Sequence, residues 1–176
     1  VVVVFVVALV GGIVSGLRGR RRRAAIRREP RLYGVGDGDD DMPAYADAPA
    51  EAGTAIYDIS AKMVYMPNGE RLEAHSGLGD YLDDPRYAHV RMKGVTPPHT
   101  YTLTEREALF HGVRAIRLNP VGGSGAIHGR AGLLAHTFML GPRGDSNGCI
   151  SFRDYDRFLQ AFLRGEVKRL VVVASL

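Results

Sequence analysis

Three stretches of the chain differ in their pattern of hydrophobic and polar residues. Residues 1–17 are almost entirely apolar and carry no charge. Residues 18–53 begin with an arginine-rich run and continue through a segment rich in Gly, Asp, Ala and Pro. In residues 54–176, short apolar runs alternate with Gly, Pro and Asn, as is typical of a folded domain. The pattern predicts an N-terminal apolar segment, a flexible linker and one compact domain.

The domain of residues 54–176 is predicted to be mainly β. Two runs rich in β-forming residues, 56–65 and 72–74, flank Asn68-Gly69 and predict a hairpin. Further strands are expected at 101–103, 115–118, 125–128 and 170–174. Thr104 and Glu107 form a capping-box pattern that predicts a short helix through Phe110. Apolar residues at helical spacing within 151–164 predict one longer helix near the C-terminus.

The apolar run at residues 1–17 is close to the length of a membrane span, since about 20 apolar residues at ~1.5 Å each cross a bilayer. No small-residue cleavage site precedes the arginines, which favours an anchor over a signal peptide. By the positive-inside rule these arginines would place the domain in the cytoplasm, but the rule compares both flanks of a span. Charge therefore leaves the topology open.

The net charge of +4 comes from the eight arginines between Arg18 and Arg31, and the rest of the chain is net negative. This run follows an apolar segment and has no interleaved aromatic residues. Contact with anionic lipid headgroups is therefore favoured over binding to nucleic acid. The aspartates between Asp37 and Asp41 lack the spacing of a calcium loop, which indicates a solvated linker.

The single cysteine, Cys149, cannot form an intramolecular disulfide and is either a small buried residue or a reactive thiol. It follows Ser146-Asn147-Gly148. An upstream histidine can activate such a thiol for acyl transfer by lowering its pKa from about 8.5. Gly148 permits the close backbone approach in which amide groups face an oxyanion, and Ser146 supplies a hydroxyl beside the thiol. On the local pattern alone, both alternatives stay open.

Several motifs follow one another in the order found in L,D-transpeptidases. His136 precedes the Ser-Asn-Gly-Cys-Ile run, and the predicted C-terminal helix and strand follow it. The other matching elements are Ala74-His75-Ser76-Gly77, Pro97-Pro98-His99-Thr100-Tyr101 and the run from Gly129 to His136. Together they make residues 54–173 resemble L,D-transpeptidases, most closely the antibacterial type VI secretion L,D-transpeptidase effectors. The resemblance implies a β-sandwich or barrel-like domain that acts on peptidoglycan.

Two histidines compete for the role of the base. Ile127-His128-Gly129 imitates the Ile-His-Gly signature of better-known transpeptidases. A Gly-Arg-x-Gly run precedes His136, and Cys149 follows His136 by 13 positions. Both features are similar to those of the effectors. The resemblance therefore favours His136 as the base and assigns His128 to a strand near the substrate groove. Asn147 replaces the His of the usual His-Gly-Cys, so a second imidazole beside the thiol is lost.

Candidate binding residues are fewer. Arg130 and Arg143 are candidates to bind a substrate carboxylate. The remaining histidines, expected at the surface or satisfied in the core because their spacing does not fit a metal site, are His75, His89, His99 and His111. Neither a metal nor an organic cofactor is expected.

The resemblance implies that Cys149 attacks the diaminopimelate carbonyl of a peptidoglycan tetrapeptide stem and releases D-alanine. Water, a stem amine or a free D-amino acid then resolves the thioester. The expected location is the cell envelope, at the periplasmic face of the inner membrane or in a target periplasm. Expected partners are peptidoglycan stem peptides, the membrane and, for a delivered effector, an immunity protein. The alternative is a non-catalytic envelope domain that binds peptidoglycan or a protein, with a structural Cys149.

Overall fold

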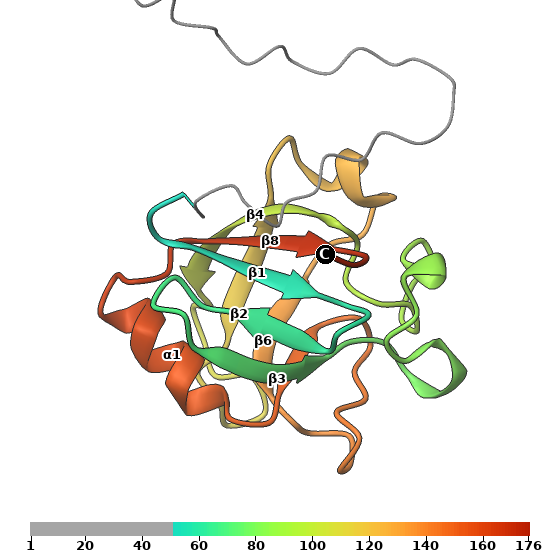
Figure 1. The fold of residues 1–176 in the computed structure, drawn as a ribbon. Helices are drawn as coiled ribbons and strands as arrows, with labels where there is room; N and C mark the ends of the chain where they lie inside the picture. The colour runs from blue at the N-terminus through green and yellow to red at the C-terminus, as the bar shows by residue number, and fades with distance from the viewer. Residues whose placement is uncertain (1–50) are drawn as a thin grey trace, which may run out of the picture. The chain divides into compact units, whose positions relative to one another are not determined.

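Eight short strands follow one another in residues 51–176, which are the residues that the computed structural model describes (Figure 1). They are β1 (Thr54–Asp58), β2 (Met63–Tyr65), β3 (Arg71–His75), β4 (His99–Glu105), β5 (Ile116–Pro120), β6 (Leu134–Thr137), β7 (Ile150–Phe152) and β8 (Arg169–Val173). The helix α1 (Tyr155–Leu163) lies between β7 and β8 in the chain. The predicted apolar segment and nearly all of the predicted linker lie outside the described residues.

The strands form a closed barrel in the order β1-β2-β3-β7-β6-β5-β4-β8. Two neighbouring pairs, β1 with β8 and β6 with β7, are parallel, and the other pairs are antiparallel. The β1–β8 pair joins the first and last strands, so the fold closes only when the C-terminal strand is in place. A closed barrel leaves no unpaired sheet edge. The expected mainly β, barrel-like domain is confirmed.

The hairpin predicted around Asn68-Gly69 is formed by β2 and β3, which pair antiparallel. Gly69 has a φ of 85°, a conformation that glycine adopts without strain. The Asn68 side chain accepts a hydrogen bond from the Glu70 amide at 2.9 Å, as asparagine does in tight turns. Turn chemistry thus explains why this part of the prediction is correct.

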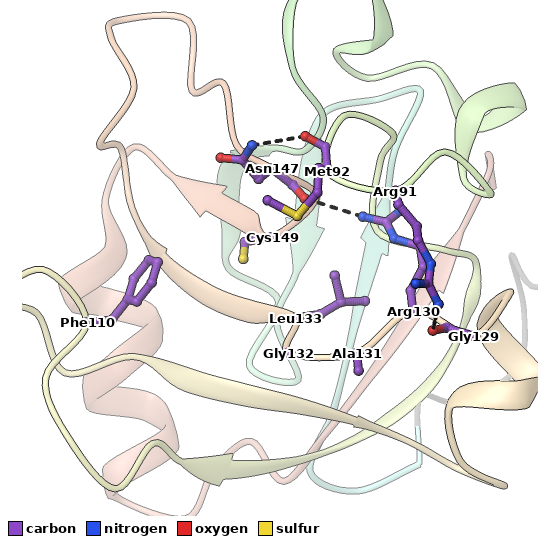
Figure 2. Close-up of a pocket in the computed structure, with 10 residues that line it drawn as sticks. All are labelled: Arg91, Met92, Phe110, Gly129, Arg130, Ala131, Gly132, Leu133, Asn147 and Cys149. Carbon is purple, nitrogen blue, oxygen red and sulfur yellow. Dashed lines mark hydrogen bonds between the residues drawn. The ribbon is translucent and has the colours of Figure 1, made fainter.

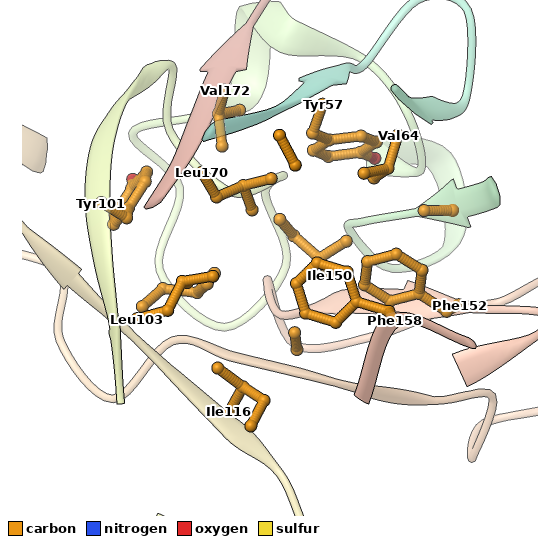
Figure 3. Close-up of a cluster of buried hydrophobic side chains, with 14 of the residues drawn as sticks. Tyr57, Val64, Tyr101, Leu103, Ile116, Ile150, Phe152, Phe158, Leu170 and Val172 are labelled. Carbon is orange, nitrogen blue, oxygen red and sulfur yellow. The ribbon is translucent and has the colours of Figure 1, made fainter. Parts of the chain in front are cut away.

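The core lies inside the barrel and continues under α1 (Figure 3). Tyr57, Ile150 and Leu170 come from three different strands and are fully buried. The predicted C-terminal helix is confirmed as α1, and its buried Phe158 stacks on Phe152 with ring centroids 4.6 Å apart. The helical stripe is therefore core, because it covers the inner face of β7.

Two predicted elements are wrong. The short helix through Phe110 does not form, because Thr104 pairs with Arg117 in the β4–β5 ladder. Residues 125–128 are not a strand: the first three belong to a 3-10 turn, Ser124–Ile127, which follows two glycines with positive φ, and His128 caps that turn. Two further 3-10 turns, Gly79–Tyr81 and Pro85–Tyr87, lie in the loop between β3 and β4. Within residues 51–176, no helix is long and apolar enough to cross a membrane.

Candidate active site

The wall that carries the candidate site is formed by β3, β7 and β6, which are neighbours in the barrel. Alternate residues of a strand face opposite sides of a sheet. The core-facing residues of this wall are Leu72, Ala74, Ala135, Ile150 and Phe152. His75, Ser151 and His136 alternate with them and are paired across the three strands, so they form a row on the other face.

Cys149 immediately precedes β7 and lines two cavities. The larger, of about 500 Å³, is bordered by Arg91 and Met92 on one loop and by residues 129–133 on another (Figure 2). The smaller, of about 90 Å³, is lined by Cys149 and His136 together. The structure therefore brings the predicted nucleophile and the favoured base to one cavity, next to a larger space open to a substrate.

His136 is held in one tautomer. Its Nδ1 lies 2.6 Å from the carbonyl oxygen of Thr137, and a carbonyl can only accept a hydrogen bond. Nδ1 therefore carries the proton, and Nε2 is left as the acceptor in the neutral ring. Burial lowers the pKa of His136 below its usual range, so the ring is neutral at pH 7. The Phe110 ring, 5.4 Å away, covers one side of it.

The Cys149 thiol is also neutral at rest. Burial raises its pKa, and the nearby Leu134 backbone and the Arg130 cation oppose that shift only in part. The expectation that the imidazole lowers the pKa of the thiol and so produces a thiolate is therefore not met in the free protein. Desolvation is the largest of these contributions. The pair consists of a neutral thiol and a neutral base.

Ser146 fixes the backbone of the cysteine loop, which we define as residues 146–149. Its hydroxyl donates to the Cys149 carbonyl at 2.6 Å and accepts from the amides of Gly77 and Gly148 at 3.3 Å each. The Ser146 amide donates to the Gly77 carbonyl at 2.8 Å. The hydroxyl therefore organises the loop rather than standing free beside the thiol, and the Gly148 amide is occupied rather than free for an oxyanion.

Gly148 is the tightest point of the cysteine loop. Its φ is 105°, and a Cβ built there would lie 1.7 Å from Nη2 of Arg130 and 2.9 Å from the Gly94 carbonyl oxygen. Its carbonyl accepts a hydrogen bond from the Thr96 hydroxyl at 2.7 Å. Only glycine fits this position, because any side chain would displace the guanidinium.

Arg130 is buried and holds several loops together. Its guanidinium donates to the carbonyls of Ala88, Val95, Gly94 and Asn147. A guanidinium has five N–H groups, and binding a carboxylate bidentately takes two of them in parallel. The four carbonyls occupy both Nη atoms. These contacts make Arg130 a positioning residue for the cysteine loop and leave only its Nε–H without a carbonyl partner, so its carboxylate-binding role stays a prediction that this geometry does not favour.

A buried pair of hydroxyl residues, Ser76 and Thr96, supports the cysteine loop from behind. The Ser76 hydroxyl accepts from the Thr96 amide at 3.1 Å and from the Tyr57 hydroxyl at 3.3 Å. Both residues have no exposed surface. The sequence motifs included Ser76-Gly77 and the segment that follows Thr96. They did not indicate that Ser76 and Thr96 support the cysteine loop. Their meeting point depends on the closed barrel, so spacing alone carried no signal for it.

The remaining predicted site residues separate into two groups. Asn147 lines both cavities and donates from Nδ2 to the Met92 carbonyl at 3.0 Å. Arg143 is exposed, lies outside these cavities and pairs with Asp145 at 2.9 Å. His128 is exposed at the left-handed end of the Ser124–Ile127 turn, 6.3 Å from the His89 ring, and lines neither cavity. The expectation of His128 on a strand is wrong.

A family model described as the Tlde1 domain matches residues 70–176, which is more than half of the chain. The chain belongs to the Tlde1 domain family. This is the type VI secretion L,D-transpeptidase effector family, so the resemblance seen in the motifs is confirmed at the level of the family. No curated protein matches the chain. The match begins just before β3, although β1 and β2 belong to the same barrel.

His75 of the Tlde1 domain is buried in the wall with both ring nitrogens paired, which agrees with the expected satisfied role. Its Nδ1 lies 2.6 Å from Asp83 and its Nε2 lies 3.1 Å from Glu73. Carboxylates only accept, so both ring nitrogens carry protons. Asp83, and more weakly Glu73, raise the pKa of His75, while a hydrogen bond from Arg153 helps hold the pKa of Glu73 at about 2. In residues 51–176, no group of His, Cys, Asp and Glu could hold a metal ion.

Replacing Gly148 with alanine is expected to destabilise the Tlde1 domain more than the same change at Gly141. Both glycines have positive φ, but a Cβ at Gly141 meets nothing within 4 Å. Gly141→Ala should lose about 1 kcal/mol from backbone strain alone, and Gly148→Ala about 3 kcal/mol or more because Arg130 must also move. Urea denaturation of the two variants measures the difference. Equal losses would contradict the packing described for Gly148.

The stability of the Tlde1 domain is expected to fall as pH rises through the folded-state pKa of His75. Because this pKa is raised, the stabilisation is fully present below the unfolded value of about 6.5 and is lost above the folded value. Free energies of unfolding between about pH 6 and pH 9 should therefore decline more steeply in the wild type than in His75→Gln. Parallel curves for the two proteins would show that His75 is not charged in the fold.

Proposed function

We propose that the protein catalyses acyl transfer on peptidoglycan stem peptides, with Cys149 as the nucleophile and His136 as the base. The observation that carries the proposal is the shared cavity of these two side chains, where Nε2 of His136 is the free acceptor nitrogen. Membership of the type VI L,D-transpeptidase effector family supports the substrate class. Family membership by itself supports a peptidoglycan-modifying activity.

The neutral state of the pair determines the order of events. Cys149 has little thiolate at pH 7, since burial raises its pKa. The thiol proton therefore passes to Nε2 of His136 as the sulfur attacks the diaminopimelate carbonyl, in general base catalysis. The imidazolium returns this proton to the amine of the departing D-alanine. A thioester on Cys149 remains, and a water, a stem amine or a D-amino acid attacks it to release the product.

The hydrogen bond from Nδ1 of His136 to Thr137 serves this sequence in two ways. It keeps Nε2 in the acceptor form before attack, and its carbonyl stabilises the imidazolium that forms during attack. The backbone thus takes the orienting role that a carboxylate has in many triads. Burial opposes the imidazolium, so the proton is held only transiently and is readily given to the leaving group.

The alternative, a non-catalytic domain that binds peptidoglycan, is favoured by one observation. The raised pKa of Cys149 is typical of an inert, structural cysteine. Slow alkylation of the free protein is therefore expected from both functions and does not discriminate between them. Turnover of a stem peptide does, because only the enzyme releases D-alanine.

The proposed site of action is the periplasm of a target cell. The Tlde1 domain belongs to secreted type VI effectors, and this is consistent with such delivery. Stem peptides in cross-linked form lie outside the inner membrane, so the substrate requires the same compartment. An immunity protein is the partner that this proposal implies.

Turnover should depend on Cys149 and His136 but not on His128. Cys149→Ala and His136→Ala are each expected to lower kcat on a disaccharide tetrapeptide by on the order of 10³-fold or more, because each removes a group of the reacting pair. His128→Ala is the matched control, since His128 is exposed and lines neither cavity. Product analysis by mass spectrometry gives the rates.

The pH dependence of the same reaction provides a second test. The pKa of His136 is lowered, so the base stays neutral, and kcat/KM stays high, down to pH values below about 6.5.

In the comparison of variants, full activity of Cys149→Ala would refute the enzyme proposal. A large loss in His128→Ala with little loss in His136→Ala would transfer the role of base to His128.

A further inference from the structure

A second arginine, Arg91, stands on the wall of the larger cavity that contains Cys149. Neither motif nor spacing marks it in the sequence. Figure 2 shows Arg91 and Arg130 close together on one side of the cavity, with Phe110 on the opposite side and Cys149 between them. The cavity thus has one cationic wall and one apolar wall.

The two guanidiniums differ in what occupies them. Arg130 is committed to backbone carbonyls, whereas Arg91 makes one hydrogen bond, from Nη2 to the Gly129 carbonyl at 2.7 Å. Among the described residues, no carboxylate pairs with Arg91, and no Asp or Glu lines this cavity. The exposed Arg91 therefore retains most of its five N–H groups for a ligand.

No anion balances these two cations within the cavity lining. The positive charge of Arg91 adds to burial in lowering the pKa of Arg130, which indicates how near the two charges lie. An anionic group that entered the cavity would relieve this repulsion. A carboxylate fits best, because its two oxygens match the planar fork of a guanidinium.

The loop that carries Arg91 is fastened to the cysteine loop. Asn147 donates to the Met92 carbonyl at 3.0 Å, and Arg130 donates to the Ala88 and Gly94 carbonyls on either side of Arg91. Met92 has a φ of 63°, which is unfavourable for a residue with a side chain and is held by these contacts. The position of Arg91 relative to Cys149 is therefore fixed before a substrate arrives.

We infer that Arg91 binds a free carboxylate of the acyl donor and so makes the enzyme selective for stem peptides that carry one next to the scissile bond. The inference rests on the proposed function and adds a specificity-determining residue to it. Two carboxylates of the stem have the required chemistry: the terminal carboxylate of D-alanine and the side-chain carboxylate of diaminopimelate. Amidation of either one removes the charge and leaves the scissile bond unchanged.

The test compares four forms of the full chain: wild type, Arg91→Gln, Arg91→Lys and Lys93→Gln. Lys93 is exposed, lies two residues away and does not line the cavity, so its variant controls for the loss of one cation. Each form is assayed on an unmodified tetrapeptide, on the D-alanine carboxamide and on the diaminopimelate side-chain carboxamide. KM and kcat are determined separately for each combination of protein form and peptide.

The wild type and Lys93→Gln should lose about tenfold in kcat/KM, through KM, on one of the two amidated peptides. That peptide identifies the carboxylate. On the unmodified peptide, Arg91→Gln should already show the rise in KM that the wild type shows on that amidated peptide. Amidation should then cause no further rise in the KM of this variant. Arg91→Lys should recover part of the affinity, since lysine keeps the charge and loses the fork.

Two results of this kinetic comparison would overturn the inference. One is an Arg91→Gln variant that keeps the wild-type preference between acid and amide. The other is a fall in kcat on all three peptides alike, which would mean that Arg91 only supports Gly129. Absence of turnover in the wild type would instead refute the proposed function. Tetrapeptide binding to Cys149→Ala would then test Arg91 separately, and equal affinity with and without Arg91→Gln would overturn the inference.

Discussion

The contact between Gly148 and the guanidinium of Arg130 is the constraint on which the rest of the site depends. A buried arginine is costly unless its N–H groups are paired, and here the carbonyls of two separate loops pair them. The same guanidinium occupies the space that a Cβ of residue 148 would need. The loop before Cys149, the loop that carries Arg91 and the strand that leads to His136 therefore hold a common geometry.

This geometry places the polar side chains of the candidate site on the outer face of the barrel wall that β3, β7 and β6 form. The inner face supplies rigidity through tightly packed residues such as Phe152, on which Phe158 of α1 stacks. The outer face carries the row His75, Ser151 and His136, in which one imidazole is charged and the other neutral. His75 is charged because two carboxylates accept its protons. His136 is neutral because burial lowers its pKa, and the one carbonyl that accepts from its Nδ1 offsets this only in part. Neighbouring positions in one sheet thus have opposite protonation states.

Local signals in the sequence predicted the elements whose cause is local. The Asn68-Gly69 turn and the apolar stripe of α1 are such cases. The helix proposed after Thr104 failed because the pairing of β4 with β5, a long-range interaction, overrides a capping pattern. The order of the motifs indicated Cys149 and His136. These two residues lie close together both in the sequence and in the fold. The roles of Thr96, Arg91 and Arg130 depend on loops that meet only after the barrel closes, so no spacing rule could assign them.

The proposed function requires that a stem peptide acylates Cys149. In that proposal the neutral thiol gives its proton to the neutral His136 during attack, which leaves a covalent thioester. Intact-protein mass spectrometry after brief mixing with a disaccharide tetrapeptide measures this intermediate directly. We expect a mass increase equal to the substrate without its terminal D-alanine, located by peptide mapping on Cys149. Release of D-alanine in Cys149→Ala, or an adduct on another residue, would contradict it.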